Sequence, residues 1–246
     1  MTFTIFPAID LRGGKVVRLA EGNPDRETVY GEDPCETAKR FKADGAEWLH
    51  IVNLDAAFEA PSTENLAVLD SILGLGIRVQ FGGGLRNRES LENAFAAGVS
   101  RAVLGTAAAE QPDLVDWALD NYGPDQIAAG IDARDGWVRV RGWAEGAEVS
   151  AVELGQRLRD QGVTWSVFTD VSRDGLGRGV NVTAAADLAT TTGLQVIASG
   201  GVAGKEDVNQ VRAAGLAGIV IGRALYEGQI RLQELIDDHH HRLQGR

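Results

Sequence analysis

Residues 6–19 read FPAIDLRGGKVVRL, and a near copy, AAGIDARDGWVRVRGW, returns at residues 128–143. In each copy an apolar run ends in one carboxylate, Asp10 in the first and Asp132 in the second, and a glycine-containing turn follows. This pattern predicts a buried strand that presents an aspartate at its C-terminal end and then continues into a hairpin-like loop. Most loop aspartates are turn formers or helix caps, but the repetition favours a paired acid and base.

Composition excludes several classes of protein. The 246 residues are 44% hydrophobic and carry a formal net charge of −11. Nucleic-acid binding needs a basic stripe that this sequence lacks, so we expect no nucleic-acid partner. Cys35 is the only cysteine, so no internal disulfide can form, which fits a cytoplasmic protein. Neither a membrane-span-length apolar run nor a signal-peptide pattern is present, so we expect no membrane association.

Short apolar runs alternate with amphipathic stretches eight times along the chain. Their near-continuous hydrophobicity is typical of parallel strands that are covered on both faces. The predicted strands are Phe3–Ile9, Trp48–Leu54, Ile77–Phe81, Arg101–Leu104, Ile127–Ile131, Trp165–Thr169, Gln195–Ser199 and Gly218–Ile221.

Helix signals separate these strands. Ser150 and Glu153 form a capping-box pattern, and Leu66, Leu69 and Leu73 mark the expected inner face of an earlier helix. Eight β-α units predict a single (β/α)8 barrel, the TIM barrel, over residues 1–246, with its active site at the C-terminal ends of the strands. A doubly wound open sheet is the alternative, but it needs a glycine-rich fingerprint after the first strand, which is not evident.

The two halves of the chain, about residues 1–122 and 123–246, match at a fixed offset. Gly83 and Gly200 lie 117 residues apart (200 − 83), and so do Gly105 and Gly222 (222 − 105). Such a repeat places corresponding loops on opposite sides of a barrel. Because bare backbone N–H groups at glycines and helix N-termini bind phosphate, the repeat predicts a ligand with a phosphate at each end.

Seven segments together resemble the family of the histidine-biosynthesis ProFAR isomerase, the phosphoribosylformimino-aminoimidazole carboxamide ribotide isomerase. They are PAIDLRGGKVVRL, EWLHIVNLDAAF, QFGGGLR, GIDARDGWVRVRGW, FTDVSRDG, VIASGGV and GIVIGRALYEG. The resemblance covers Phe3 to Gly228 and every predicted barrel strand. It implies an Amadori rearrangement of an aminoaldose to an aminoketose, a small bis-phosphorylated substrate, and no metal or organic cofactor.

The resemblance also implies roles for individual residues. Asp10 would be the general base that removes the sugar C2 proton, and Asp132 the general acid that opens the furanose. Thr169 and Asp174 would sit beside the acid, and Trp143 would stack on the aminoimidazole. The candidate substrate-binding residues are Arg18, His50, Gly83, Gly84, Arg86, Gly105, Thr106, Arg141, Trp143, Gly175, Gly200, Gly201, Gly222 and Arg223.

One residue departs from the family pattern. Asn53 stands where the family usually has aspartate, and the repeat pairs it with Asp170 (170 − 53 = 117). A neutral amide can still form hydrogen bonds at this position, so we expect a change in tuning rather than a loss of activity.

Three other functions remain open at this point. The sister cyclase of the same pathway, which works with a glutaminase, usually has a cysteine and DVK in its first strand and lacks the GW that this chain has at Gly142 and Trp143. A dual-substrate isomerase that also acts on phosphoribosylanthranilate would use the same two aspartates. A non-catalytic phosphosugar-binding barrel would gain nothing from Asp10 and Asp132. We expect a monomer, because no loop is apolar enough to form an evident interface.

Overall fold

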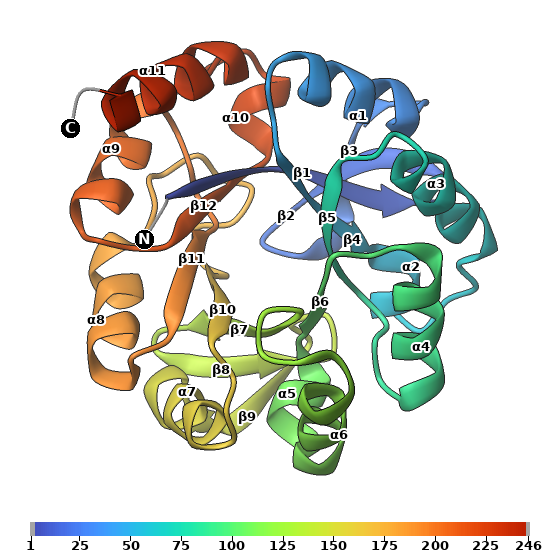
Figure 1. The fold of residues 1–246 in the computed structure, drawn as a ribbon, viewed down its shortest axis with the longest axis vertical. Helices are drawn as coiled ribbons and strands as arrows, with labels where there is room; N and C mark the ends of the chain where they lie inside the picture. Colours follow the sequence, from blue (N-terminus) through green and yellow to red (C-terminus); the bar gives the residue numbers. More distant parts are fainter. Residues whose placement is uncertain (1–2, 245–246) are drawn as a thin grey trace.

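The computed structural model describes residues 3–244, with side chains as far as residue 239, and it is a barrel of parallel strands ringed by helices (Figure 1). The barrel strands are β1 (Thr4–Arg12), β4 (Trp48–Asn53), β5 (Arg78–Gly82), β6 (Arg101–Leu104), β7 (Ile127–Arg134), β10 (Trp165–Asp170), β11 (Gln195–Ser199) and β12 (Gly218–Ile221). β1 pairs in parallel with β12, and β7 with β10, so the ring closes. The predicted (β/α)8 barrel is confirmed.

Helices between successive strands, and one after the last strand, cover the outside of the barrel (Figure 1). They are α1 (Pro34–Ala43), α3 (Thr63–Leu73), α4 (Arg88–Ala97), α6 (Pro112–Tyr122), α7 (Ala151–Asp160), α8 (Val182–Thr192), α9 (Lys205–Ala213) and α11 (Leu232–Gln244). α7 begins at the capping box expected from the sequence, in which Ser150 and Glu153 satisfy each other's backbone N–H groups. Three short helices, α2 (Leu54–Ala57), α5 (Thr106–Glu110) and α10 (Arg223–Tyr226), follow β4, β6 and β12 directly.

Two strands run further than the sequence predicts. β1 continues to Arg12 and β7 to Arg134, so Asp10 and Asp132 lie two residues before the strand ends rather than at them. Each strand leaves the barrel and pairs with an antiparallel partner, β2 (Lys15–Ala20) in the first half and β8 (Trp137–Val140) in the second. β3 (Asn23–Gly31) and β9 (Glu145–Ser150) complete the two hairpins. The two acids therefore sit where the barrel becomes a hairpin.

Alternation along the strands separates an inner core from an outer one. The inner cluster contains Phe6, Ala8, Val103, Ala128, Val167, Ile197, Ala217 and Val220, with Trp48 and Trp165 packed against it. The larger cluster lies between the strands and the helices. Since side chains two residues apart share a face, Asp10 follows Phe6 and Ala8 on the inner face of β1. The inner core thus ends, at the top of the barrel, in the candidate acids.

Asn53, the residue that departs from the family pattern, caps a helix. Its side-chain oxygen accepts hydrogen bonds from Ala56 N at 3.2 Å and from Asn65 Nδ2 at 2.8 Å, and the residue is 1% exposed. Asn65 also donates to Leu11 O and accepts from Gly14 N, which connects α3 to the first hairpin. An amide oxygen performs this acceptor role as a carboxylate would.

The inner face of α3 differs from the sequence prediction at one residue. Leu69 is 3% exposed and Ile72 fully buried, but Leu66 is 51% exposed. Asn65, rather than Leu66, takes the inward position because its amide binds the first hairpin. The fully buried stripe is Asn65, Leu69 and Ile72, at the spacing i, i+4, i+7, and the predicted Leu73 is half-buried and packs against the core.

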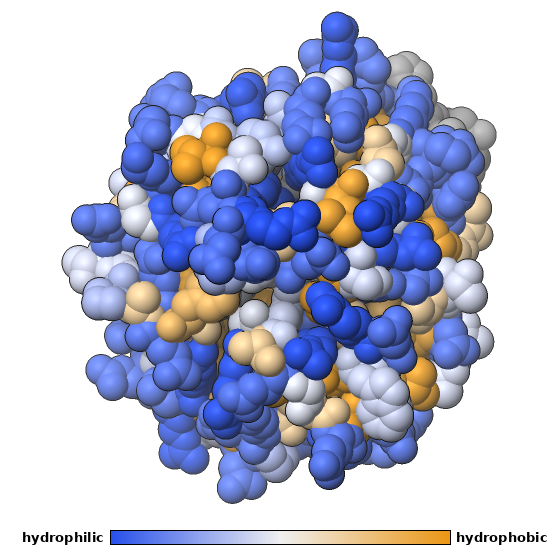
Figure 2. Space-filling model, turned by 180° about the vertical axis from the view of Figure 1, so that it is seen from behind, coloured by the Kyte–Doolittle hydropathy of each residue, from blue (hydrophilic) through white to orange (hydrophobic). Residues whose placement is uncertain are grey.

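The surface view in Figure 2 shows apolar side chains scattered among hydrophilic ones on the face turned to the viewer. Within the described part of the chain, no helix is both long and apolar enough to cross a membrane.

The two leucines of α3 give a matched test of this packing. We expect Leu69→Ala to lower the free energy of unfolding by about 2–5 kcal/mol, because it leaves a cavity under the helix. Leu66→Ala removes the same atoms from an exposed position and should change it by no more than about 0.5 kcal/mol. Urea unfolding followed by circular dichroism measures both, and equal losses would contradict the described orientation of α3.

Candidate active site

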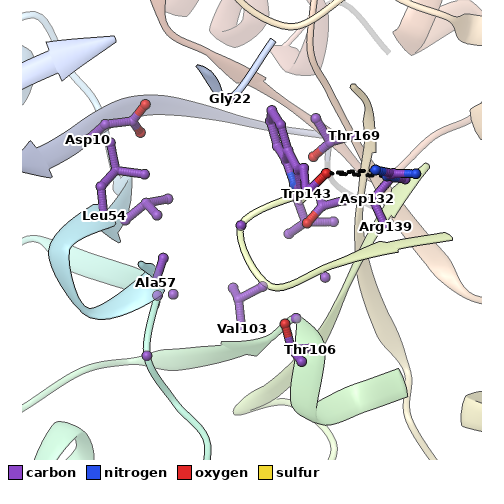
Figure 3. Close-up of a pocket in the computed structure, with 18 of the residues that line it drawn as sticks. Asp10, Gly22, Leu54, Ala57, Val103, Thr106, Asp132, Arg139, Trp143 and Thr169 are labelled. Carbon is purple, nitrogen blue, oxygen red and sulfur yellow. Dashed lines mark hydrogen bonds between the residues drawn. The ribbon is translucent and has the colours of Figure 1, made fainter. Parts of the chain in front are cut away.

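A cavity opens at the C-terminal ends of the barrel strands, and every candidate site residue from the sequence lines it or the smaller cavity beside it. Figure 3 shows Asp10 on one side of the larger cavity and Asp132, Thr169 and Trp143 on the other. The smaller cavity holds Gly175, Gly200, Gly201, Gly222 and Arg223. Arg18, Asp174 and Ser199 line both cavities, so the two are neighbours.

A buried ion pair holds Asp10 in place. Arg18 of β2 contacts its carboxylate through Nη1 at 2.6 Å and contacts Asp174 through Nη2 at 3.5 Å. Burial raises the pKa of Asp10 to about 6, with a further rise from Asp174, while Arg18 acts to lower it. Burial also raises the pKa of Asp174, again against the effect of Arg18. Asp10 can therefore change its protonation state close to neutral pH.

Asp132 lies in a different environment. Burial raises the pKa of its carboxyl group, the negative charge of Asp174 raises it further, and hydrogen bonds with Trp143 and Thr169 lower it. Thr169 of β10 is the direct neighbour of Asp132 across the strand pair. Two neutral hydrogen-bond donors oppose the effect of burial at Asp132, whereas the cation Arg18 opposes it at Asp10.

The second hairpin folds its turn over the cavity. Arg141, Gly142 and Trp143 follow one another in the left-handed region, with φ of 53°, 63° and 70°. Arg141 and Trp143 raise the free energy of the folded chain in that conformation, because a Cβ atom disfavours it. Arg139 compensates by donating to the carbonyl oxygen of Trp143 at 3.0 Å (Figure 3).

Close contacts fix where this turn lies. The ring of Trp143 packs so tightly on Gly22, in the turn of the first hairpin, that a Cβ at Gly22 would overlap it. A Cβ at Gly142 would lie 2.7 Å from the ring of Phe58. The hairpins of the two half-barrels therefore meet above the cavity.

The first glycine rim is built by Gly83, Gly84, Gly105 and Thr106. Gly83 and Gly84 have φ of 92° and 78°, and an added Cβ at Gly83 would collide with the backbone of Asn53. These two glycines are thus needed for packing between strands, beyond the phosphate approach inferred from the sequence. Gly105 has no protein atom within 4 Å of an added Cβ, so its backbone is the open part of this rim. The Thr106 hydroxyl accepts a hydrogen bond from Arg141 N at 2.9 Å.

The second rim repeats this arrangement. Gly200 and Gly201 have φ of 87° and 83°, and an added Cβ at Gly201 would lie 2.5 Å from the carbonyl oxygen of Gly179. At Gly222 an added Cβ would lie 2.5 Å from the guanidinium group of Arg18. Arg18 therefore reaches from Asp10 to the second rim.

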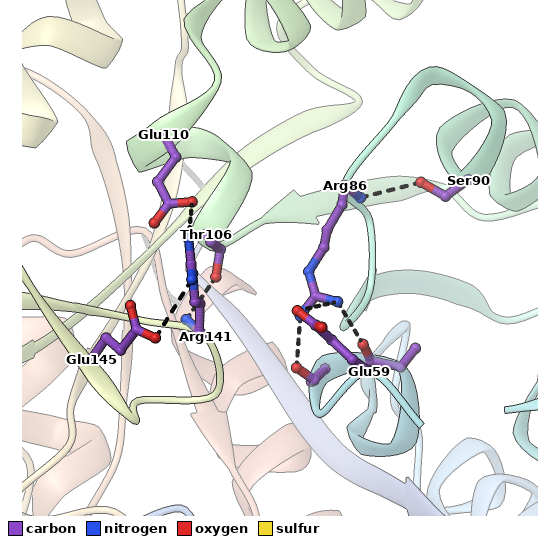
Figure 4. Close-up of polar contacts among 9 residues, drawn as sticks. Glu59, Arg86, Ser90, Thr106, Glu110, Arg141 and Glu145 are labelled. Carbon is purple, nitrogen blue, oxygen red and sulfur yellow. Dashed lines mark hydrogen bonds and ion pairs between the residues drawn. The ribbon is translucent and has the colours of Figure 1, made fainter. Parts of the chain in front are cut away.

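Three candidate arginines at the mouth are held by other groups of the protein. Arg86 donates to the carbonyl oxygens of Ala56 and Ala57, at 3.3 and 2.8 Å (Figure 4). Arg223 donates to the carbonyl oxygen of Gly175 at 2.7 Å. The side chain of Arg141 makes long ion pairs, 3.5 Å each to Glu110 and Glu145, and is 51% exposed.

Four lining residues have no role predicted from the sequence, namely Gly22, Phe58, Arg139 and Ser199. Arg139 lies within the second aspartate copy, and Phe58 and Ser199 lie in segments that resemble the family, but no pattern there distinguishes them from their neighbours. Ser199 was recognisable only as the last residue of a predicted strand. Gly22 could not be found, because its role depends on a tryptophan 121 residues away (143 − 22).

The fold and this site together define a (β/α)8-barrel enzyme with two acids at its mouth, Asp10 buried and Asp132 half-buried. The family described as "Histidine biosynthesis protein" matches residues 4–231. The chain belongs to this family, and it is an isomerase.

Similar proteins cover almost the whole chain. One from Sphingopyxis alaskensis is 48% identical over 236 residues, which is 95% of this chain and 96% of that protein. One from Geobacillus thermodenitrificans is 45% identical over 238 residues, 96% of this chain and 97% of that protein. Both are named 1-(5-phosphoribosyl)-5-((5-phosphoribosylamino)methylideneamino)imidazole-4-carboxamide isomerase.

The charges around Asp10 give a test that needs no substrate. We expect its carboxyl group to titrate with a pKa of about 6 in the folded protein, against 3.8 ordinarily, as followed by carbonyl ¹³C NMR. Arg18→Met should raise this pKa further and Asp174→Asn should lower it. Because the folded state binds this proton more tightly, the group stabilises the fold at acid pH and that contribution is lost as pH rises through about 6. A fall in the pKa on Arg18→Met would contradict the described ion pair.

Proposed function

We propose that the chain catalyses the Amadori rearrangement of the bis-phosphorylated aminoimidazole carboxamide ribotide, with Asp10 as general base and Asp132 as general acid. The observation that carries the proposal is the pair of carboxyl groups that face one cavity between two glycine rims. The names of the similar proteins support this substrate.

The first step needs a proton donor. Asp132 protonates the furanose ring oxygen, the C1–O bond breaks, and the nitrogen on C1 forms a protonated imine. Burial and the nearby Asp174 favour the protonated form of Asp132 before the reaction, and two substrate phosphates would favour it further. Thr169, which neighbours Asp132 across the strand pair, holds the carboxyl group toward the cavity.

The second step needs a base. Asp10 removes the proton from C2, the electrons move into the C1–C2 bond, and the imine becomes an enolamine that tautomerises to the aminoketose. The ion pair with Arg18 supports the charged form of Asp10, and a pKa of about 6 leaves it mostly deprotonated at neutral pH. Asp174 raises the pKa of both acids, so the two roles are separated by Arg18, which pairs with Asp10.

The two rims hold the ends of the substrate in this proposal. Gly105 and the N-terminus of α5 would contact one phosphate, and Gly222 with the N-terminus of α10 the other. Backbone N–H groups supply most of this binding, which suits a chain with a net charge of −11.

A dual-substrate activity has one supporting observation. Phosphoribosylanthranilate ends in a carboxylate rather than a second phosphate, so it would leave the first rim empty and need an arginine instead. The Arg141 side chain makes two ion pairs of 3.5 Å, whereas Arg18 is buried against two carboxylates. Arg141 is equally well placed to contact the bis-phosphorylated ribotide, so we propose the dedicated activity as the main one.

Two glycines of the first rim separate packing from phosphate binding. Gly83→Ala should destabilise the fold by at least about 1–2 kcal/mol, because its φ of 92° disfavours a Cβ and that Cβ would strike Asn53. Gly105→Ala adds a methyl group to open space, so we expect it mainly to raise KM by obstructing the phosphate. Urea unfolding and steady-state kinetics measure the two effects. An unchanged KM in Gly105→Ala would show that no substrate phosphate binds at this rim.

The decisive experiment is turnover of the bis-phosphorylated ribotide by the purified protein, run beside phosphoribosylanthranilate. We expect kcat/KM for phosphoribosylanthranilate to be lower by at least about 10³, because the site loses a charged contact. Asp10→Asn and Asp132→Asn should each lower kcat by roughly 10²–10⁴-fold and leave KM nearly unchanged. No turnover of the ribotide would refute the proposed function, equal efficiencies would establish the dual one, and normal kcat in either variant would reassign that aspartate.

A further inference from the structure

A chain of three polar side chains crosses the interior of the barrel beneath the cavity. Arg101 on β6 donates from Nη1 to Gln80 Oε1 at 3.1 Å, and Gln80 Nε2 lies 3.0 Å from Nδ1 of His50. The three residues are direct partners across neighbouring strands, His50 with Gln80 and Gln80 with Arg101. All are at most 8% exposed. The chain therefore connects the lower barrel to a residue that lines the cavity.

The chemistry of Arg101 sets the direction of every hydrogen bond in this chain. A guanidinium group can only donate, so the side-chain oxygen of Gln80 must face it and the amide nitrogen must face His50. The amide nitrogen also only donates, so Nδ1 of His50 accepts and carries no proton. Burial, with the charge of Arg18, lowers the pKa of His50 to about 4, so the ring is neutral at pH 7. Its single proton then belongs on Nε2.

Arg101 is itself held rigidly. Its guanidinium carbon lies 4.0 Å from the ring centre of Trp165 and 4.9 Å from that of Trp48, and its Nε donates to Asp125 O at 3.0 Å. Burial lowers the pKa of Arg101 to about 10, which still leaves it charged at neutral pH. A fixed, donor-only group thus anchors the lower end of the chain.

The other half of the barrel shows that the fold does not require this chain. At the offset of 117 residues, Val167 (50 + 117), Ile197 (80 + 117) and Gly218 (101 + 117) occupy the equivalent positions. Buried polar groups are costly compared with such apolar packing, so their presence in one half needs a reason. That half is the one beside Asp10, because His50 pairs with Ala8, two residues before Asp10 on the same face of β1.

We infer that Gln80 and Arg101 are positioning residues that lock His50 in the Nε2–H tautomer, so that it presents a hydrogen-bond donor to a sugar oxygen of the opened substrate beside Asp10. This inference rests on the proposed function. With the proton on Nδ1 the ring would present a lone pair to that oxygen and repel it. The two buried residues therefore act on the reaction through His50, without contact with the substrate.

Nitrogen NMR on protein labelled with ¹⁵N-histidine reads the tautomer without substrate. The chain has four histidines, and the spectrum of His50→Gln identifies the signals of His50. We expect the unaltered protein to show a protonated Nε2 and an unprotonated Nδ1 from about pH 5.5 to 8, above the pKa of His50. A proton on Nδ1 in this range would overturn the inference.

Gln80→Glu reverses the direction of the chain. The new carboxylate can accept from both Arg101 and His50, so Nδ1 should gain a proton, and kcat should fall roughly 10²-fold, as for the loss of one positioned donor. KM should change much less. Gln80→Met, which resembles Ile197 in the other half, is expected to leave a mixture of tautomers and a smaller loss of kcat. If Gln80→Glu does not fold, Gln80→Met tests the inference in its place.

Ile197→Val is the matched control, since it alters the same layer of the barrel away from His50. It should leave both the tautomer and kcat as they are. A tautomer shift without a fall in kcat, or a fall in kcat without a tautomer shift, would overturn the positioning role. Absence of turnover by the unaltered protein would refute the proposed function instead, and the NMR spectrum would still decide the tautomer.

Discussion

The contact of Arg18 with Asp10 and Asp174 is the interaction on which the site depends. It joins β1 and β2 of the first half-barrel to the loop after β10 in the second. Removing one partner of such a buried group leaves an unpaired charge, which costs several kcal/mol. The same guanidinium packs on Gly222 at the second rim. One buried cation therefore positions the candidate base, opposes the rise in its pKa that burial causes, and packs against the second glycine rim.

The internal repeat supplies a symmetric scaffold that carries asymmetric chemistry. Both halves contribute a strand with an aspartate, a hairpin and a left-handed glycine pair. The symmetry ends at the side chains: Arg18 accompanies one acid, Trp143 and Thr169 the other. A reaction that needs both an acid and a base at neutral pH needs this difference, because two identical sites would titrate alike.

Much of the fold and the location of the site were predictable from the sequence. Parallel strands that are buried on both faces give continuous apolar runs, so β6, β11 and β12 were placed with their observed limits. α3 was placed correctly, but its inner face was wrong at Leu66, because the decisive partner of Asn65 is a hairpin 51 residues away in the chain. The strand ends at Asp10 and Asp132 were also placed too early, because a strand that continues into a hairpin keeps its extended backbone without its apolar pattern.

The sequence by itself determined the eight-fold alternation, the two aspartates and the two glycine rims, because each depends on local patterns or on the repeat. The tertiary structure alone decided what surrounds each group. It placed Arg18 against two acids, the Trp143 ring on Gly22, and Arg101 behind Gln80 and His50. Burial and charge at a site come from segments far apart in the chain, and the pKa of a carboxyl group or the tautomer of an imidazole follows from those neighbours rather than from its own sequence.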